Sequence, residues 1–572
     1  MMAEQRTLGI SDYAVLVVTL LVSLGIGLYF RCTGGKQKTA KEYLLGDRNQ
    51  SVLPVAVSLM ASVMSAVTLL GVSAEVYMYG TIFLTIIVSY VLFTAVAAYL
   101  YLPVFFKLEA TSAYEYLERR FSRRVRLAAS VLYSVQMVLY MGIVLYAPTI
   151  ALEALTGLSR NTSTLVVGAV CTVYATIGGI KAVIWTDVFQ GALMYSALFS
   201  VIGMAVWDRG GFSPIWRIAQ DHGRIQLFDF TPDPTVRHST WALFFGGGFT
   251  FLSLYAVNQN QVQRYLTMKD HKTAVRSLWF SLPFLYLLLL ACGFAGLSIF
   301  SAYYTCDPVK SGRISSLDQL MPLYVMDKMG HVHGLSGLFT AGIFSASLST
   351  VSSCVNSLAA VTVEDYLKPL LPRIEATGST ALAKCLVLLY GLACLGVGFL
   401  AQHIGGLLQA GLSIMGIAGG PLLGTFTLGM FLPCANEPGA LAGIALGIIS
   451  AAWIGFGQPK PKPTPLPLST DGCFNMSSSA LPISTLTQVQ YPFMYRLSYL
   501  LYVVIGCCVT LLVGCLVSWL AVYFGYHPPH PISPDLFTPP VARFLQKPQS
   551  ASEVELQQIM LKESQTKKVV ED

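Results

Sequence analysis

The sequence predicts an all-α polytopic membrane protein with about thirteen transmembrane helices. Of its 572 residues, 54% are hydrophobic and only 11% are charged, whereas a soluble protein carries about a quarter charged residues. Because so few charges cannot cover a chain of this length with polar surface, we expect the lipid bilayer to surround most of it. No Lys/Arg-rich block accompanies the net charge of +7, so we expect no nucleic-acid partner.

Apolar runs of about 20 residues, the length that a membrane-spanning helix needs, recur along the chain between polar breaks. The first run is followed by Arg31, Lys36 and Lys38, the reverse of the charge order in a signal peptide, and we interpret it as a first span. The predicted spans are 11–30, 52–75, 82–106, 127–151, 162–180, 185–207, 239–258, 277–301, 335–365, 380–402, 405–431, 438–457 and 497–524.

Charge placement orients these spans. With the amino end outside, most Lys and Arg residues fall in the inner segments, which are 31–50, 107–126, 259–276, 366–384 and the tail from 525. This is the positive-inside bias of membrane proteins. We therefore predict a transmembrane domain over 1–525 and, because residues 526–572 begin with prolines and end in mixed charge, a flexible cytoplasmic tail.

Two features of the predicted outer loops agree with this orientation. The glycosylation sequons at Asn161 and Asn475 both lie outside, whereas a third at Asn49 lies inside and should stay unmodified. Among twelve cysteines, only Cys306 and Cys473 fall in outer loops, where an oxidising environment permits a disulfide. We expect the other cysteines to be buried small hydrophobic residues.

Two spans contain small or hydroxyl residues that favour an interruption of the helix. The second span has Ser58, Ser62, Ser65 and Thr68 around its middle, and the seventh contains Gly246-Gly247-Gly248. Transporters of one large class bind their cargo where paired helices break near the bilayer midplane. The two positions are five spans apart, as a five-plus-five inverted repeat would place them. The alternative is that these small residues only permit close helix packing.

The ninth span carries six hydroxyl residues within positions 345–353. Single serines in membrane helices usually bond back to the preceding turn, but six exceed what packing needs. A hard cation such as Na+ prefers oxygen ligands. Ser349, Thr350 and the carbonyl of Ala346 one turn earlier offer three such oxygens.

At these residues the chain resembles the sodium/solute symporter family. The resemblance covers about residues 10–525 and rests on the long strings Thr111–Phe121, Gly178–Gln190, Asn258–Tyr265, Ser357–Asp365 and Gly419–Gly424. It implies a LeuT-like core whose inverted repeats span about 52–207 and 239–431, with one extra helix before them and two after.

Within the family, the chain is similar to the branch of the sodium-coupled monocarboxylate, multivitamin and iodide transporters. Tyr140–Pro148 and Phe431–Asn436 resemble the multivitamin member, whereas Ser65–Thr68 and the segment at Cys306 resemble the monocarboxylate members. The iodide symporter has Gln in place of Thr68, which weakens the iodide interpretation.

The resemblance also implies roles for matched positions. The family's sodium site corresponds to backbone oxygens of Ala61, Met64 and Ala346 and the hydroxyls of Ser349 and Thr350. Its cargo or a second sodium would lie near Ser62, Ser65, Thr68, Tyr140 and Ser413. Asp187 matches an acid linked to sodium passage; the alternative is that it caps the start of the sixth span.

The expected function is sodium-coupled, electrogenic import of a small organic monocarboxylate anion, such as a short-chain acid or biotin or pantothenate, across the plasma membrane. Na+ would be the coupling ion, and we expect no organic cofactor. A sodium/iodide-type symporter and a non-transporting sensor on the same fold are the alternatives. A channel lacks support because no repeated pore loop or charged ring is visible. An enzyme is not expected, because no nucleophile–base pair or H-x-x-x-H metal motif lies in the spans.

Overall fold

The computed structural model describes residues 8–32, 48–108, 112–177, 179–368, 376–402, 406–461, 463–473, 491–526 and 533–546. Within these residues the chain is helical and has no β-strand. The first half forms α1 (Ile10–Cys32), α3 (Val52–Ala61), α4 (Ala66–Tyr79), η2 (Thr81–Ile86), α5 (Ile87–Val96), η3 (Ala97–Tyr101), α6 (Leu102–Leu108), α7 (Glu115–Arg120), α8 (Arg123–Thr156), α9 (Arg160–Ile177), α10 (Ile180–Arg209), α11 (Phe212–Asp221), η4 (Ala242–Gly246), α12 (Gly247–Tyr255) and α13 (Gln259–Tyr265).

The second half continues with equally long helices. It forms α14 (His271–Tyr303), η5 (Leu317–Gln319), α15 (Leu320–Met329), α16 (Leu335–Val361), η6 (Thr362–Leu367), α18 (Ala376–Ala401), α19 (Leu407–Phe431), α20 (Glu437–Phe456), η7 (Phe493–Arg496), η8 (Tyr499–Leu501), α21 (Tyr502–Tyr523), η9 (Pro534–Leu536) and α22 (Pro539–Leu545).

The expectation of a polytopic helical membrane protein is confirmed. In the described part, ten helices are long and apolar enough to cross a membrane, and an eleventh span results when α3 and α4 are taken together. Helix α9 and the segment η4–α12 lie at the two remaining predicted positions. The count of thirteen and the inverted repeat stay predictions.

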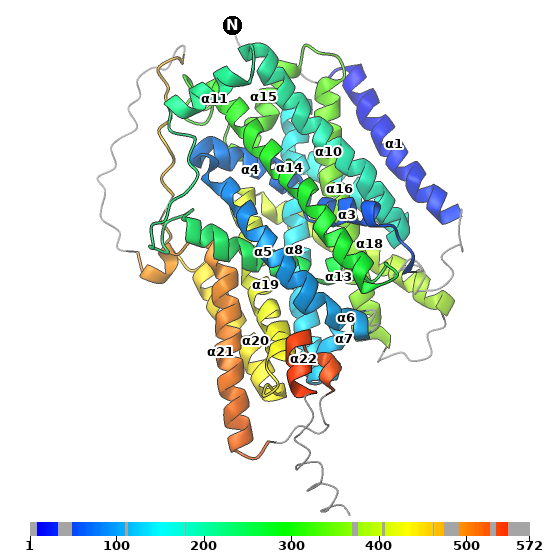
Figure 1. Cartoon of the computed structure of the whole chain (residues 1–572). Coiled ribbons are helices and arrows are strands. Elements are labelled where there is room, and N and C mark those ends of the chain that lie inside the picture. The colour runs from blue at the N-terminus through cyan, green and yellow to red at the C-terminus, as the bar shows by residue number, and fades with distance from the viewer. Residues whose placement is uncertain are drawn as a thin grey trace, which may run out of the picture.

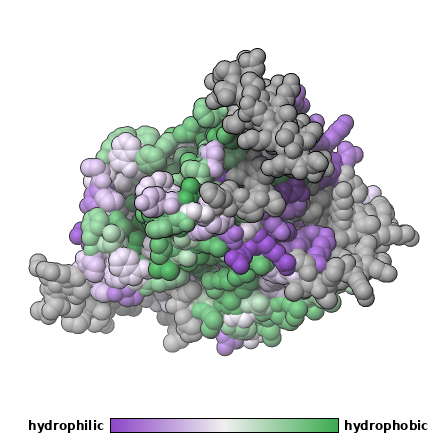
Figure 2. Space-filling view, turned by 90° about the horizontal axis from the view of Figure 1, so that it is seen from below, coloured by the Kyte–Doolittle hydropathy of each residue, from purple (hydrophilic) through white to green (hydrophobic). Residues whose placement is uncertain are grey.

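Helix α16 lies at the centre of the bundle. All of its residues from Phe339 to Val361 are buried, and α1, α8, α9, α10 and α18 pack around it. By contrast, α1 lies at one edge of the molecule (Figure 1) and exposes Val17, Val18 and Leu21. An apolar helix with an exposed apolar face is what a lipid-facing position requires. Seen from below, hydrophobic and hydrophilic residues share this face, and one group of hydrophilic residues lies near its middle (Figure 2).

The second predicted span is broken, as its hydroxyl residues indicated. Helices α3 and α4 are bent by 60° relative to each other. Ser62 closes α3, and its hydroxyl donates to the carbonyl of Leu59 at 3.3 Å. Ser65 opens α4 with extended backbone (φ −99°, ψ 177°). A serine that bonds locally to the backbone offers an alternative to the helical ladder, which explains why the break falls here.

The prediction of a break at Gly246-Gly247-Gly248 is wrong. These glycines continue through η4 into α12 with helical dihedral angles. They serve close packing instead: a Cβ on Gly248 would stand 2.1 Å from the ring of Phe93, and one on Gly246 2.4 Å from the carbonyl of Leu500. The interruption in this span comes later, at residues 256–258, where Asn258 has extended backbone and caps α13.

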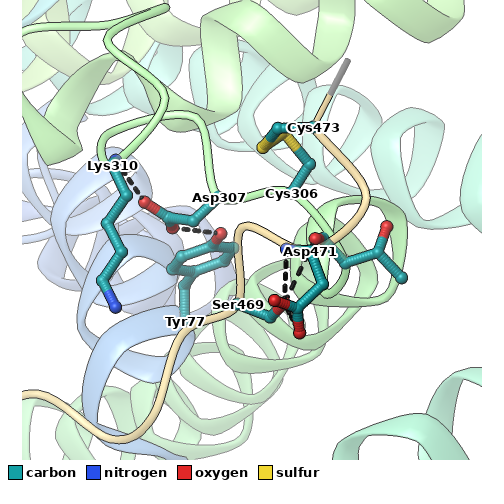
Figure 3. Close-up of a disulfide and its surroundings, with 8 residues drawn as sticks. Tyr77, Cys306, Asp307, Lys310, Ser469, Asp471 and Cys473 are labelled. Atoms are coloured by element: carbon teal, nitrogen blue, oxygen red, sulfur yellow. Dashed lines mark hydrogen bonds between the residues drawn. A yellow bond between two sulfur atoms is a disulfide. The ribbon is translucent and has the colours of Figure 1, made fainter. Parts of the chain in front are cut away.

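The loop after α20 is fastened across one end of the molecule. Cys306, just after α14, forms a disulfide with Cys473 (Figure 3). Arg224 is fully buried and donates to the carbonyls of Met78, in α4, and Pro467, in the loop. The segment 463–473 is therefore held to the end of α14 by a covalent bond and to the end of α4 by hydrogen bonds.

Residues 533–546 pack against the opposite end (Figure 1), in contrast to the flexible tail predicted from residue 526. The Thr538 amide donates to the carbonyl of Met430, in α19, and the Tyr116 hydroxyl donates to the carbonyl of Leu536. Phe537 is 1% exposed and lies against the guanidinium of Arg120. This part of the tail is docked on the ends of α7 and α19.

Candidate functional site

A cavity of about 90 Å³ lies beside the break between α3 and α4. Four of the residues predicted from the sequence line it, namely Ser62, Met64, Thr68 and Tyr140. The remaining polar lining comes from Tyr90, Thr250, Asn258, Asn260 and Gln261, and the rest is mainly apolar. The cavity has room for only a few water molecules. A mostly apolar cavity with a few placed polar groups is the usual form of a small-molecule site.

The predicted sodium ligands come from two elements that meet. Helix α16 packs against both α3 and α4. Among the described residues, no backbone N–H around the break donates to the carbonyls of Ala61 and Met64. On α16, the Thr350 hydroxyl donates to the carbonyl of Ala346 at 3.1 Å. Because a hydroxyl that donates its proton keeps its lone pairs, Thr350 and Ser349 can still offer oxygen to a cation.

Asp187 does not cap the sixth span, because α10 begins two turns earlier with Gly179 as its N-cap. The carboxylate is fully buried and accepts hydrogen bonds from Ser58 on α3 and Ser349 on α16, each at 2.6 Å. Asp187 is thus attached both to the broken helix and to one of the proposed sodium ligands.

Arg264 on α13 neutralises this buried carboxylate. Its Nη2 lies 3.2 Å from Asp187 Oδ2 and also donates to Ser353, while Nε donates to Ser58 at 2.9 Å. Nη1 donates to both oxygens of Asn260 at 2.7 Å. All five N–H groups of the guanidinium are therefore used. The network joins α3, α10, α13 and α16, that is, both interrupted spans and the central helix.

Sequence reasoning missed the role of the segment after the second interruption. It treated 259–276 as an inner segment, but Asn258–Tyr265 is buried throughout. Gln261 donates to the Ser62 hydroxyl at 3.0 Å and to the carbonyl of Leu59 at 3.3 Å, and its Oε1 has no partner in the described part of the chain. The sequence does contain a signal for this role: a run of side-chain amides and one Arg directly follows an apolar span, which is the composition expected of a polar cavity wall.

Within the described part of the chain, the other residues predicted from the sequence do not line the central cavity. The Ser65 hydroxyl lies 3.5 Å from that of Tyr140 without lining the cavity, and Ser413 is half-buried on α19 outside the lining. Asn161 is exposed at the start of α9. Asn475 lies outside the described residues.

A helical membrane protein with two interrupted spans around a central, mostly apolar cavity that carries a few polar groups has the architecture of a secondary transporter. The chain belongs to the sodium:solute symporter family, whose model matches residues 43–447. The family resemblance inferred from the sequence is thereby confirmed.

Similarity to individual proteins agrees with this family assignment. The chain is 51% identical to a putative sodium-dependent multivitamin transporter of Drosophila melanogaster, over 95% of this chain and 93% of that one. It is 44% identical to the human sodium-coupled monocarboxylate transporter 1, over 89% and 86%. Its fold is similar to that of a Na+-coupled sialic acid symporter solved in a substrate-bound outward-open state. The TM-score is 0.73 at 25% identity, covering 91% of this chain and 99% of that one. The LeuT-like fold class is therefore confirmed.

Proposed function

We propose that this protein imports small organic monocarboxylates across the plasma membrane by coupling them to Na+. The observation that carries the proposal is the broken α3–α4 helix: the carbonyls of Ala61 and Met64 at the break accept no backbone hydrogen bond in the described part, and both halves of the helix contact the hydroxyl-bearing helix α16. Relatives named for multivitamin and monocarboxylate transport support the choice of cargo. Biotin, pantothenate and lactate all carry a single carboxylate.

In the proposed mechanism, Na+ binds the oxygens of Ala61, Met64, Ala346, Ser349 and Thr350 and thereby holds the break against α16. Cargo binds in the adjacent cavity, along Ser62, Thr68 and Tyr140. Because the ion and the cargo then share the segment 61–68, each favours the same conformation, and by linkage each must raise the affinity of the other. The cavity is small, so we infer that a vitamin-sized cargo enters when α4 and α19 move apart.

Asp187 and Arg264 act as positioning residues in this proposal. Asp187 accepts a hydrogen bond from the Ser349 hydroxyl, which leaves the lone pairs of that oxygen available to the proposed cation. Arg264 keeps the carboxylate ionised without competing directly for the ion, since its donors are directed at Asp187, Ser58, Ser353 and Asn260.

The sodium gradient and the membrane potential supply enough free energy to drive the proposed uptake. A tenfold sodium gradient supplies about 1.4 kcal/mol per ion, and a potential of about 60 mV adds roughly 1.4 kcal/mol per net charge. Two Na+ with one monoanion would gain about 4 kcal/mol, enough to concentrate cargo about a thousandfold. We therefore propose electrogenic uptake, with the amino end outside and the carboxyl end in the cytoplasm.

The test is uptake of labelled biotin, pantothenate, lactate, butyrate and iodide in one expression system, with Na+ or with choline in its place. We expect sodium-dependent uptake of at least one carboxylate, accompanied by inward current under voltage clamp. Uptake of iodide alone would favour the inorganic-anion alternative. Reconstituted protein that binds Na+ and carries none of the five would favour a sensor.

A further inference from the structure

A second and larger cavity, of about 520 Å³, lies at the end of the molecule that the proposed topology places outside. We call it the vestibule. The segment around Lys460 and Thr464, the turn at Arg496 and the loop at Arg237 line it, with Asp229 as the only acid among its lining residues in the described part. It adjoins the central cavity: Gln409 and Tyr499 line the vestibule, and their chain neighbours Leu408 and Leu500 line the central cavity.

Arg237 and its contacts form a layer of side chains between the two cavities. Its Nε donates to Glu75 on α4 at 2.7 Å and its Nη1 to Gln409 on α19 at 2.8 Å. The guanidinium lies between the rings of Tyr79 and Tyr499, at 4.7 and 4.9 Å. Its charge is balanced by Glu75, so Arg237 adds little positive potential to the vestibule.

The other two cations are not balanced by an acid within hydrogen-bond distance. Lys460 Nζ donates to the Tyr502 hydroxyl at 2.9 Å and to the carbonyl of Gly455 at 2.5 Å, which are both neutral acceptors, and one of its protons is left. Arg496 is exposed and has no salt bridge in the described part, and its charge helps to lower the pKa of the exposed Asp233, which lies outside the lining. Asp229 is partly satisfied by Thr231, which donates to its Oδ1 from both the amide and the hydroxyl. With Arg237 balanced by Glu75, the lining residues in the described part set Lys460 and Arg496 against Asp229, which leaves one net positive charge in a recess, where low-dielectric walls strengthen the field.

We propose that the vestibule is an outer docking site for a carboxylate anion, in which Lys460 and Arg496 bind the carboxylate before the layer at Arg237 opens. This inference rests on the proposed function and adds to it a second cargo site, outward of the central cavity. Docking at an exposed cationic site raises the local concentration of anion at the gate and is screened by salt.

The test measures KM and maximal rate of sodium-dependent uptake of labelled biotin and butyrate, in whole cells, with surface expression quantified. The variants are Lys460→Gln, Arg496→Gln and the double variant. The matched control is Arg217→Gln, which removes an exposed Arg from α11 outside the vestibule. Because charge contributions at partly exposed sites are modest, we expect each vestibule variant to raise KM about two- to fivefold with the maximal rate unchanged. Lys460→Arg should keep the wild-type KM.

A second arm varies ionic strength with choline chloride at constant Na+. Added salt should raise the KM of the wild type toward that of the double variant and leave the double variant almost unchanged. An unchanged KM in Arg496→Gln and Lys460→Gln would overturn the inference, as would an equal rise in Arg217→Gln. If the wild type itself takes up neither carboxylate with Na+, the proposed function fails instead. Arg496 makes no hydrogen bond in the described part, so its variant should fold normally.

Discussion

The hydroxyl of Ser349 on α16 donates a 2.6 Å hydrogen bond to Asp187 Oδ1 on α10, and both residues are fully buried. The two positions are 162 residues apart in the sequence. The same carboxylate pairs with Arg264, whose side chain is 1% exposed. A proposed sodium ligand, a buried acid and a buried cation thus form one connected unit, and the first two predictions concern this unit and its neighbour Thr350.

Replacing Asp187 with Asn should strongly destabilise the protein. The amide keeps the size of the side chain but leaves the Arg264 charge buried without its counter-charge. Breaking a buried pair in this way costs about 3–5 kcal/mol. The thermal midpoint of the purified protein in detergent measures the loss.

Asp208→Asn is the matched control on the same helix. Asp208 pairs with Lys328 at 3.2 Å, but the two side chains are 25% and 42% exposed. Such a pair contributes about 0–1 kcal/mol, so the control should lie near the wild type. Equal midpoints for the two variants would contradict a structural role of the Asp187–Arg264 pair.

Thr350→Ala should raise the sodium concentration needed for half-maximal uptake. It removes one proposed oxygen ligand together with the hydrogen bond that this hydroxyl donates to the carbonyl of Ala346. We expect a rise of about tenfold, which corresponds to about 1.4 kcal/mol. Thr350→Ser keeps the hydroxyl and should stay near the wild-type value. A sodium dependence that does not change in the Ala variant, at normal surface expression, would remove Thr350 from the site.

Phe537→Ala should loosen the docked tail. The Phe537 ring is buried beneath Arg120, with 5.0 Å between the guanidinium carbon and the ring centroid. Truncation of a buried Phe to Ala costs about 3–5 kcal/mol, which should lower the thermal midpoint. Phe544, in the same segment, is 72% exposed, and Phe544→Ala should change little. If both variants melt like the wild type, the segment 533–546 does not contribute to stability.

Asp318 should make stability depend on pH. Burial raises the pKa of this carboxyl to about 6, from an ordinary value of 3.8, although hydrogen bonds from Leu407 and Ser316 act in the opposite direction. The folded state therefore binds the proton more tightly than the unfolded state. Above pH 6 the ionised form costs up to about 3 kcal/mol, and this cost disappears as pH falls from about 6 toward 4.

Asp318→Asn does not titrate and isolates this effect. On lowering the pH from 7.5 to 5, the wild type should gain stability relative to the variant, measured as the difference between their thermal midpoints. A difference that stays constant across this range would mean that Asp318 is already protonated or already ionised throughout it.

The membrane-domain architecture was largely predictable from the sequence, because the signals for it are local. A membrane helix satisfies its backbone hydrogen bonds within one segment, so the length of each apolar run indicates a span regardless of its neighbours. Every predicted span corresponds to a helical segment among the described residues. The break at Ser62–Ser65 was also predictable, since Ser62 bonds to its own preceding turn.

The candidate site was only partly predictable, because its central contacts are not local. Gly246–Gly248 have the composition of a break, yet the close approach of Phe93 and Leu500 makes them packing residues. Arg264 follows an apolar span, as a cytoplasmic cation does, but its partners Asp187 and Ser353 lie far away in the sequence. Composition cannot show which helix faces which.

The sequence by itself determined that this protein is a helical membrane carrier, and it placed oxygen-rich residues at 58–68 and 345–353. Apolar length and local hydroxyl groups suffice for both. Only the tertiary structure decided that Asp187 is a buried network member and not a cap, that the second interruption lies at 256–258, and that Lys460 and Arg496 share one recess. Each of these depends on segments that meet only when the helices pack, because burial and charge pairing are properties of the space between helices.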